Sequence, residues 1–162
     1  MRRVVLALLL CCGLVLPAAA FDDPKALLDA VYAGYQAGGN RTTPETYYSA
    51  RLKGLYAANL ERQALDADKG IAVDPNAPPV LDFDPFIEGN HALIAEFQMG
   101  QPVVTGNRAV ATVSFANFDH RATLAISLVR EGDGWKVDDI ASLSGENWLL
   151  SWLLQYDPFG GM

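Results

Sequence analysis

The sequence predicts an α+β fold in which N-terminal helices pack on a curved four-stranded antiparallel sheet, followed by a C-terminal helix. Apolar residues recur at helical spacing in the front half, whereas the back half alternates with a period of two. Turn-forming pairs such as Gly106-Asn107 and Asp133-Gly134 separate the alternating runs. Each half needs the other to bury its apolar face, so residues 21–162 are expected to form one domain.

Three helices are predicted in the front half, each opening with a capping side chain followed by proline. Asp23 caps the first, which runs from residue 24 to the glycines at 38–39. Thr43 caps the second, which starts at residue 44 and carries an apolar stripe from Tyr48 to Leu60. Asp84 caps a short third helix that ends near residue 89.

Four strands are predicted at residues 93–99, 108–115, 122–128 and 135–140, each with one apolar face. Tight turns are expected between them, including one at Asp119-His120. A final helix capped by Ser144 carries the aromatic and leucine side chains up to Tyr156.

Residues 1–20 have the pattern of a cleavable signal peptide. A basic start is followed by an uncharged apolar run over residues 4–16 and by Ala18-Ala19-Ala20. The apolar run is shorter than the roughly 20 residues that span a bilayer. We therefore expect cleavage before Phe21, export to the periplasm or the medium, and no membrane span after cleavage.

Cleavage would change the composition of the chain. It would remove both cysteines and two of the 12 Lys and Arg residues, leaving 10 basic against 19 acidic side chains. This acidic balance argues against nucleic acid and against anionic membrane surfaces as partners. With no cysteine and only His91 and His120, no zinc-binding spacing is present, so no metal and no cofactor are expected.

Three segments resemble a known bacterial family. They are Val-Leu-Asp-Phe-Asp-Pro-Phe-Ile at 80–87, Gly-Trp-Lys-Val-Asp-Asp-Ile at 134–140, and Tyr-Tyr-Ser-Ala-Arg-Leu-Lys-Gly-Leu-Tyr at 47–56. They are similar to domain of unknown function 3828 (DUF3828), and the resemblance covers about residues 26–154. The second segment also recurs in cone-shaped folds of the nuclear transport factor 2 type. The motif residues singled out in this way are Asp82, Asp84, Pro85, Trp135 and Asp138.

The resemblance implies a cone-like α+β fold and export in bacteria. It implies no activity, because the family has none assigned. The chain departs from the family pattern at Asn90-His91, where the family has a Gln-Asp pair.

Two polar constellations have ordinary structural interpretations. Asp82 and Asp84 alternate like the start of a calcium loop, but Leu93 stands where that loop needs a glutamate. Asp84 is therefore expected to cap the short helix. His120 next to Asp119 resembles a general base, but turn chemistry favours a solvated histidine.

Asp139 is the predicted pocket carboxylate. Because strand side chains alternate, Trp135, Val137 and Asp139 are expected to share the face that points into the cone. Phe97 and Phe115 are predicted to line the same ligand pocket. The alternative is a strand that breaks near Asp138, since strand ends and bulges re-aim side chains; residue 140 would then turn inward and Asp139 would lie in solvent.

Two classes of function remain open at this level. The first is a non-enzymatic binding module for a small ligand or a protein partner, which the absence of a catalytic motif favours. The second is a small enzyme that uses a pocket carboxylate as general acid or base.

Export predicts a defined N-terminus. Mass spectrometry of the protein recovered from the periplasm or medium should find Phe21 as the first residue, because the small-residue site precedes it. Recovery of the intact chain from the cytoplasm alone would contradict this prediction.

Overall fold

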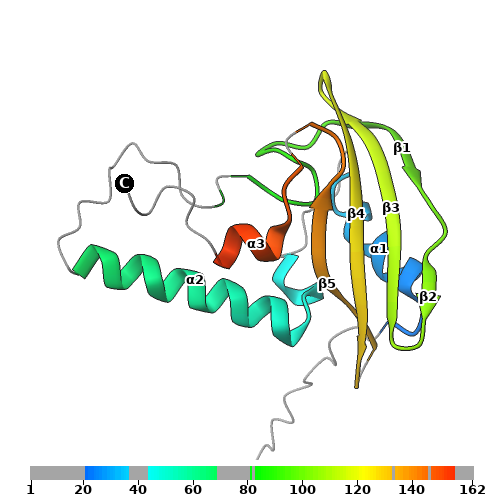
Figure 1. Ribbon diagram of the computed structural model, residues 1–162. Coiled ribbons are helices and arrows are strands. Elements are labelled where there is room, and N and C mark those ends of the chain that lie inside the picture. Colours follow the sequence, from blue (N-terminus) through cyan, green and yellow to red (C-terminus); the bar gives the residue numbers. More distant parts are fainter. Residues whose placement is uncertain are drawn as a thin grey trace, which may run out of the picture.

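The computed structural model describes residues 21–36, 44–68, 81, 83–132, 134–145 and 147–155. Several predictions fall outside these residues: the expected signal peptide, the glycines at 38–39, Thr43, Asp82, Asp133 and Tyr156. The helical elements are α1 (Pro24–Ala33), the 3₁₀ helix η1 (Pro44–Tyr47), α2 (Ala50–Asp68) and α3 (Leu150–Gln155). Figure 1 shows them around one sheet, with α2 reaching away from it.

The sheet is antiparallel and has five strands, so the predicted α+β class is confirmed and the predicted strand count of four is wrong. The strand order is β1-β3-β4-β5, and β2 pairs with the same edge of β3 that β1 occupies. At three residues, β2 is too short to show a sequence period. The strands are β1 (Ile94–Met99), β2 (Val103–Thr105), β3 (Arg108–Asn117), β4 (His120–Glu131) and β5 (Gly134–Ser142).

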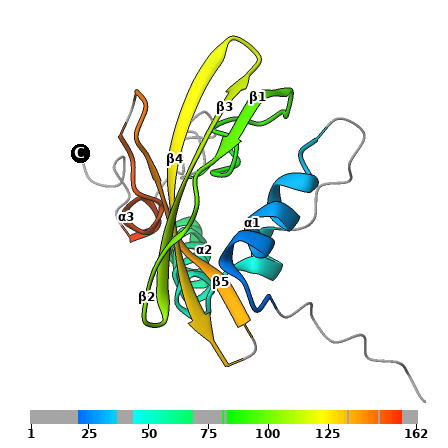
Figure 2. The ribbon, with the colours of Figure 1, turned by 90° about the vertical axis from the view of Figure 1, so that its right-hand side faces the viewer.

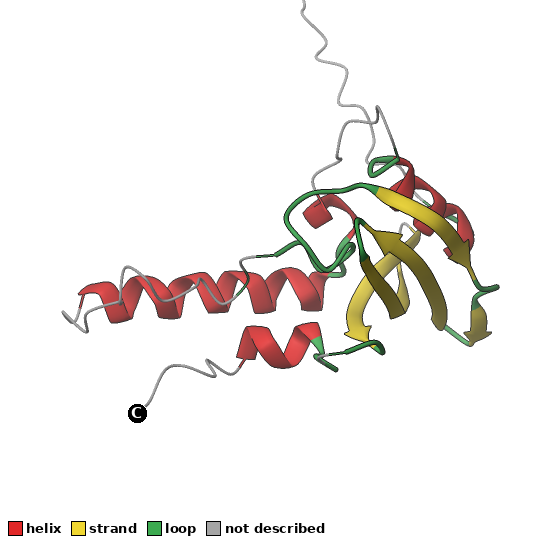
Figure 3. Cartoon of the chain, turned by 90° about the horizontal axis from the view of Figure 1, so that it is seen from above, coloured by secondary structure: helices red, strands yellow, loops and turns green. Residues whose placement is uncertain are grey.

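The helices occupy both faces and one edge of the sheet. Figure 2 shows α1 on one side of the strands and α3 on the other. Figure 3 shows α2 and α3 running side by side away from the sheet. No helix in the described part of the chain is both long and apolar enough to cross a lipid bilayer.

The first helix starts as its sequence predicts, but it ends at Ala33, before the glycines that were predicted to stop it. Asp23 accepts a hydrogen bond from the Ala26 amide at 3.1 Å, and Pro24 takes the first helical position. The buried side chains follow a helical stripe. They are Leu27, Leu28, Val31 and Tyr32.

The second predicted helix is interrupted, so the prediction of a single helix from residue 44 is wrong. Tyr48 forms a parallel bridge to Val137, and the Ser49 amide donates to the Val137 carbonyl at 2.8 Å. Ser49 then caps α2, because its hydroxyl accepts from the Leu52 amide at 3.0 Å. Two residues therefore join the edge of the sheet between η1 and α2.

A bulge in β5 overturns the predicted register. Leu128 pairs with Val137 and Ser127 with Asp139, so Asp138 is an extra residue between the two pairs. Val137 and Ile140 are fully buried on the core face. Asp139 therefore does not share the face of Trp135 and Val137. Ile140 turns inward as the alternative expected, but the strand bulges and continues to Ser142 instead of breaking. Asp139 is nevertheless only 14% exposed, and it is not a solvated side chain.

The two bulge carboxylates each hold a helix. Asp138 accepts from the Ser49 hydroxyl at 2.7 Å and from Arg51 Nε at 3.0 Å, which fixes the start of α2. Asp139 accepts from the Ser151 amide at 3.0 Å and so caps α3. The predicted cap, Ser144, lies upstream of this helix and instead accepts from the Thr123 amide at 2.7 Å.

Trp135 lies in the core, as its position in the last strand predicts, with 3% of its surface exposed. Its amide donates to the Phe21 carbonyl at 2.8 Å, so the start of the described chain runs beside β5. Gly134 permits this approach, because a Cβ there would lie 2.7 Å from the Phe21 nitrogen. Its φ of +147° also favours glycine.

Asp138 predicts a pH-dependent stability. Burial alone would raise the pKa of Asp138, but hydrogen bonds from Arg51 and Ser49 and the charges of Arg51 and Arg108 lower it below its ordinary value. A lowered pKa in the folded state means stability that is present above the unfolded pKa of about 3.9 and is lost as pH falls through the folded pKa.

We expect Asp138→Asn to lower the free energy of unfolding by about 1.5–3 kcal/mol at pH 7, with the difference shrinking below about pH 4. Urea unfolding across pH measures this. Asp29→Asn is the control, since its carboxylate forms only an exposed pair with Lys25. An equal loss in both variants, or a difference independent of pH, would contradict the prediction.

Candidate functional site

A tight turn replaces the short helix predicted after Asp84. The Asp84 amide donates to the Gly89 carbonyl at 3.0 Å, which closes the chain on itself. The Asp84 carboxylate accepts from the Phe86 amide at 3.0 Å and from the Tyr35 hydroxyl at 2.7 Å. Asp84 is thus a structural residue, as predicted. It stabilises a turn and does not cap a helix, because the chain closes on itself between Asp84 and Gly89.

This turn holds Glu88 in a left-handed backbone conformation, with φ of +47°. Such a conformation is costly for a residue with a Cβ and persists only where neighbours enforce it. Phe86 and Ile87 are fully buried just before it. Asn117 donates to the Ile87 carbonyl at 3.1 Å and ties the turn to the end of β3.

The Glu88 carboxylate is paired on one side only. Its Oε2 lies 3.1 Å from Nε2 of His120, the first residue of β4. The Glu88 side chain is 7% exposed and that of His120 is 53% exposed. Within the described residues, buried Oε1 of Glu88 receives no hydrogen bond. His120 was predicted to be a solvated turn residue; its side chain is exposed as predicted, and it also contacts Glu88 from the first position of β4.

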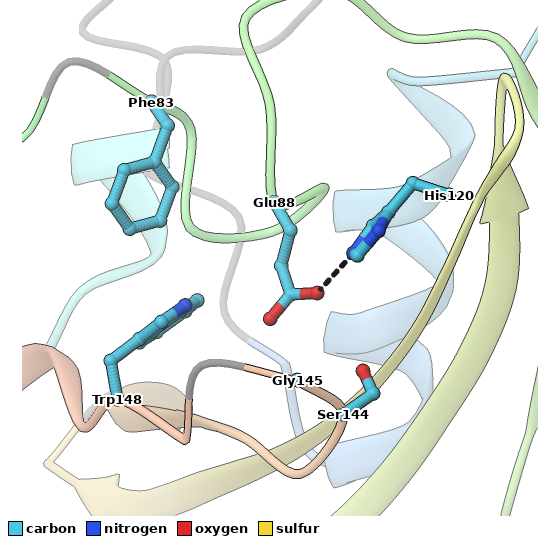
Figure 4. Close-up of a pocket in the computed structure, with 6 residues that line it drawn as sticks. All are labelled: Phe83, Glu88, His120, Ser144, Gly145 and Trp148. Carbon is cyan, nitrogen blue, oxygen red and sulfur yellow. Dashed lines mark hydrogen bonds and ion pairs between the residues drawn. The ribbon is translucent and has the colours of Figure 1, made fainter.

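A cavity of about 280 Å³ lies against this pair. Figure 4 shows the carboxylate projecting between the imidazole on one side and two aromatic rings on the other. These rings belong to Phe83 and Trp148, whose centroids are 5.2 Å apart at a tilt of 59°. Ser144 and Gly145 complete the lining.

Ser144 does not form a nucleophile pair with the histidine. Its hydroxyl oxygen accepts from the Thr123 amide, and its carbonyl accepts from the Ser142 hydroxyl at 3.0 Å. No hydrogen bond between Ser144 and His120 occurs among the residues that the structure describes. The arrangement can hold a hydrogen-bond donor and move a proton at Glu88 or His120, but it does not present an activated serine.

A second pocket of about 730 Å³ lies at the base of α2. There the rings of Tyr48 and Tyr56 stack with centroids 5.3 Å apart and hydroxyls 3.4 Å apart. Burial is the main cause that raises the pKa of Tyr56 to about 12. Glu131, also in the lining, accepts from the Ala50 amide at 2.9 Å. These polar groups have protein partners, which makes this pocket a weaker candidate than the Glu88 cavity.

The residues predicted for a ligand pocket lie elsewhere. Phe97 and Phe115 pack with Tyr32, at ring distances of 4.9 and 6.3 Å, between α1 and the sheet. Trp135 belongs to the same core, and Asp139 caps α3 on the opposite face. Their assignment to a ligand pocket stays a prediction, and none of them lines the Glu88 cavity.

The family-motif residues are placed at structural positions. Asp84 and Pro85 form the turn before Glu88, Trp135 is in the core, and Asp138 anchors α2. Asp82 lies outside the described residues. The described part of the chain contains no group of three or more His, Cys, Asp or Glu side chains placed to hold a metal ion.

Sequence reasoning missed Glu88, Phe83 and Trp148 as site residues. Glu88 precedes a glycine in a segment predicted to be helical, and Trp148 fitted the stripe of the last helix. The one available signal was the pair of glycines at 89 and 145. Glycines mark turns, and side chains next to turns more often belong to binding sites than side chains within strands do.

The unpaired oxygen of Glu88 predicts that this residue does not stabilise the fold. Replacement by glutamine removes a buried charge that is only half paired, so Glu88→Gln should be at least as stable as the parent protein. Asp84→Asn is the matched control, because both Asp84 oxygens accept hydrogen bonds, and it should lose about 1–3 kcal/mol. Thermal and urea unfolding measure both variants. A larger loss at Glu88 than at Asp84 would show that Glu88 is structural.

Comparison with known proteins gives one weak structural similarity. No protein-family model and no curated protein matches the chain. A chain from the crystal structure of the type VI native effector–immunity complex Tae3–Tai3 from Ralstonia pickettii is similar at a TM-score of 0.42 and 22% identity. The match covers 77% of this chain and 98% of that one. At this level neither partner nor activity is transferred, and the site rests on its own geometry.

Proposed function

We propose that this chain is an exported, non-enzymatic binding module whose Glu88 cavity receives a small ligand or a side chain of a protein partner. The observation that carries the proposal is the buried Oε1 of Glu88, which faces no donor among the described residues. A carboxylate removed from water without a partner costs free energy. A donor brought by a ligand would offset that cost only in the complex.

The backbone supports the same proposal. Glu88 carries a strained left-handed φ in a turn that neighbouring hydrogen bonds hold in place. Glu88 thus combines a strained backbone with a buried carboxylate whose one internal partner among the described residues is His120. Such a combination is typical of binding and catalytic sites.

A small enzyme is the second candidate, and the contact between Glu88 and His120 is the observation that favours it. A carboxylate accepts the Nε2 hydrogen and leaves Nδ1 of the imidazole to accept a proton. The two candidates differ in the demand they place on His120. Binding needs only its shape and hydrogen bond, whereas proton transfer needs the imidazole itself.

The fold and family form part of the proposal. We infer a cone-like arrangement of the nuclear transport factor 2 type and membership of DUF3828. The antiparallel sheet with α1 on one face, and the register shifts in β1 and β5, support the cone, since bulges bend strands. The family resemblance names no ligand, so the chemistry of the cavity must identify it.

The binding function is tested by titrating ¹⁵N-labelled protein with a mixture of small amines, amides and carboxylic acids. Saturable shifts of the Trp148 indole and Gly145 amide signals are expected, because both residues line the cavity. Trp148→Ala should abolish the shift of the Gly145 amide, whereas Trp152→Ala should leave both shifts in place, since Trp152 lies on α3 outside the lining. No saturable shift with any compound would refute the proposal.

His120→Gln separates the two candidates. Glutamine can still donate to Glu88, so a binding module should keep its affinity within a few-fold. Turnover of a bound compound by the parent protein, together with its loss in His120→Gln, would establish the enzyme instead.

A further inference from the structure

We infer that the group bound in the Glu88 cavity is an organic cation, an ammonium group carried on a short alkyl chain. The inference rests on the binding function proposed above and deepens it by naming the ligand class. Three features of the cavity converge on this chemistry: a half-paired carboxylate, a pair of aromatic rings, and the absence of basic lysine or arginine side chains from its described lining.

The carboxylate sets the sign of the charge. Oε2 is engaged by His120, so Oε1 is the atom that remains for a ligand. A carboxylate oxygen only accepts hydrogen bonds, so the ligand atom next to it must be a donor. A donor that is also positively charged makes the stronger and shorter bond. An anion would be repelled, because no lysine or arginine of the described lining could neutralise it.

The aromatic rings separate a cation from a neutral donor. A neutral donor such as a hydroxyl or an amide could donate a hydrogen bond to Oε1 just as an ammonium group could. Only a cation also gains from the π electrons of Phe83 and Trp148, whose rings lie across the cavity from His120. The methylene groups of an alkylammonium would meanwhile contact the same rings.

The size of the cavity limits the rest of the ligand. A volume of about 280 Å³ lies at the small end for ligand pockets and suits an ammonium group with a few carbon atoms. Glu88 can meet such a group, since its Oε1 has no partner among the described residues and the terminal torsion of glutamate is broad. The net charge of −7 on the whole chain would also attract cations from a distance.

Two sources supply this chemistry: a free aliphatic amine, and the lysine side chain of a protein partner. Both carry a primary ammonium on a chain of methylene groups. The shared group is the inference, and the source is decided by experiment.

The test compares matched probes by NMR titration and calorimetry at constant ionic strength. The probes are n-butylammonium, its neutral analogue butyramide and its anionic analogue butyrate. Butylammonium should bind at least about tenfold more tightly than either, and Glu88→Gln should remove that preference. Glu96→Gln, the same change at an exposed position 59% accessible, should leave it intact.

Each outcome bears on a separate claim. Binding of butyramide or butyrate with equal affinity, or a butylammonium affinity unchanged by Glu88→Gln, would overturn the cation inference while leaving a binding pocket in place. If none of the three probes binds, including butylammonium, the proposed binding function is wrong as well.

The source is resolved by two blocked tripeptides, one with a central lysine and one with a central glutamine. Tighter binding of the lysine peptide than of butylammonium would support recognition of a protein partner. Tighter binding of the free amine would support a small molecule. Either result upholds the cation, whereas a glutamine peptide that binds as tightly as the lysine peptide, with both tighter than butylammonium, would count against it.

Discussion

The carboxylate of Asp138 is the contact on which the arrangement of this molecule depends. It sits at the extra residue of β5 and receives the Ser49 hydroxyl and the Arg51 guanidinium, with Arg108 3.6 Å away. Ser49 in turn caps α2, and its backbone extends the sheet beyond β5. The direction in which the long helix leaves the sheet is therefore decided by one side chain that is 8% exposed.

The neighbouring Asp139 shows why such a contact resists prediction. Alternation placed the first residues of β5 correctly, and Trp135 and Val137 are buried as expected. The alternation rule failed at one inserted residue, because a bulge exchanges the two faces of the sheet for all later side chains of the strand. Nothing local in the pair of aspartates announces the bulge. Its cause is tertiary, since α2 and α3 both require a carboxylate at their first turns.

Long periodic segments were predictable, and short or capped ones were not. The first helix, four of the strands and the turn at Gly106 follow from spacing and turn chemistry. The three-residue β2 is too short to show a period, although it pairs locally with β3. The break at Ser49 and the late start of α3 are fixed by Val137 and Asp139 in β5. The candidate site belongs to the second group. Its residues come from the turn at 83–88, the start of β4 and the segment before α3, which only the folded sheet brings together.

The anchoring of two helices at consecutive residues has a mechanical consequence. At about 1.5 Å per residue, the 19 residues of α2 form a rod about 28 Å long, held to the sheet at one end. Along its side, Asn59 and Arg62 donate hydrogen bonds to the last carbonyls of α3, so the two helices are joined and would move together. A rotation of about 10° at the bulge would sweep the far tip through about 5 Å, given that helical rise. Small changes beside Asp138 and Asp139 are thus amplified into large displacements at the opposite end of the arm.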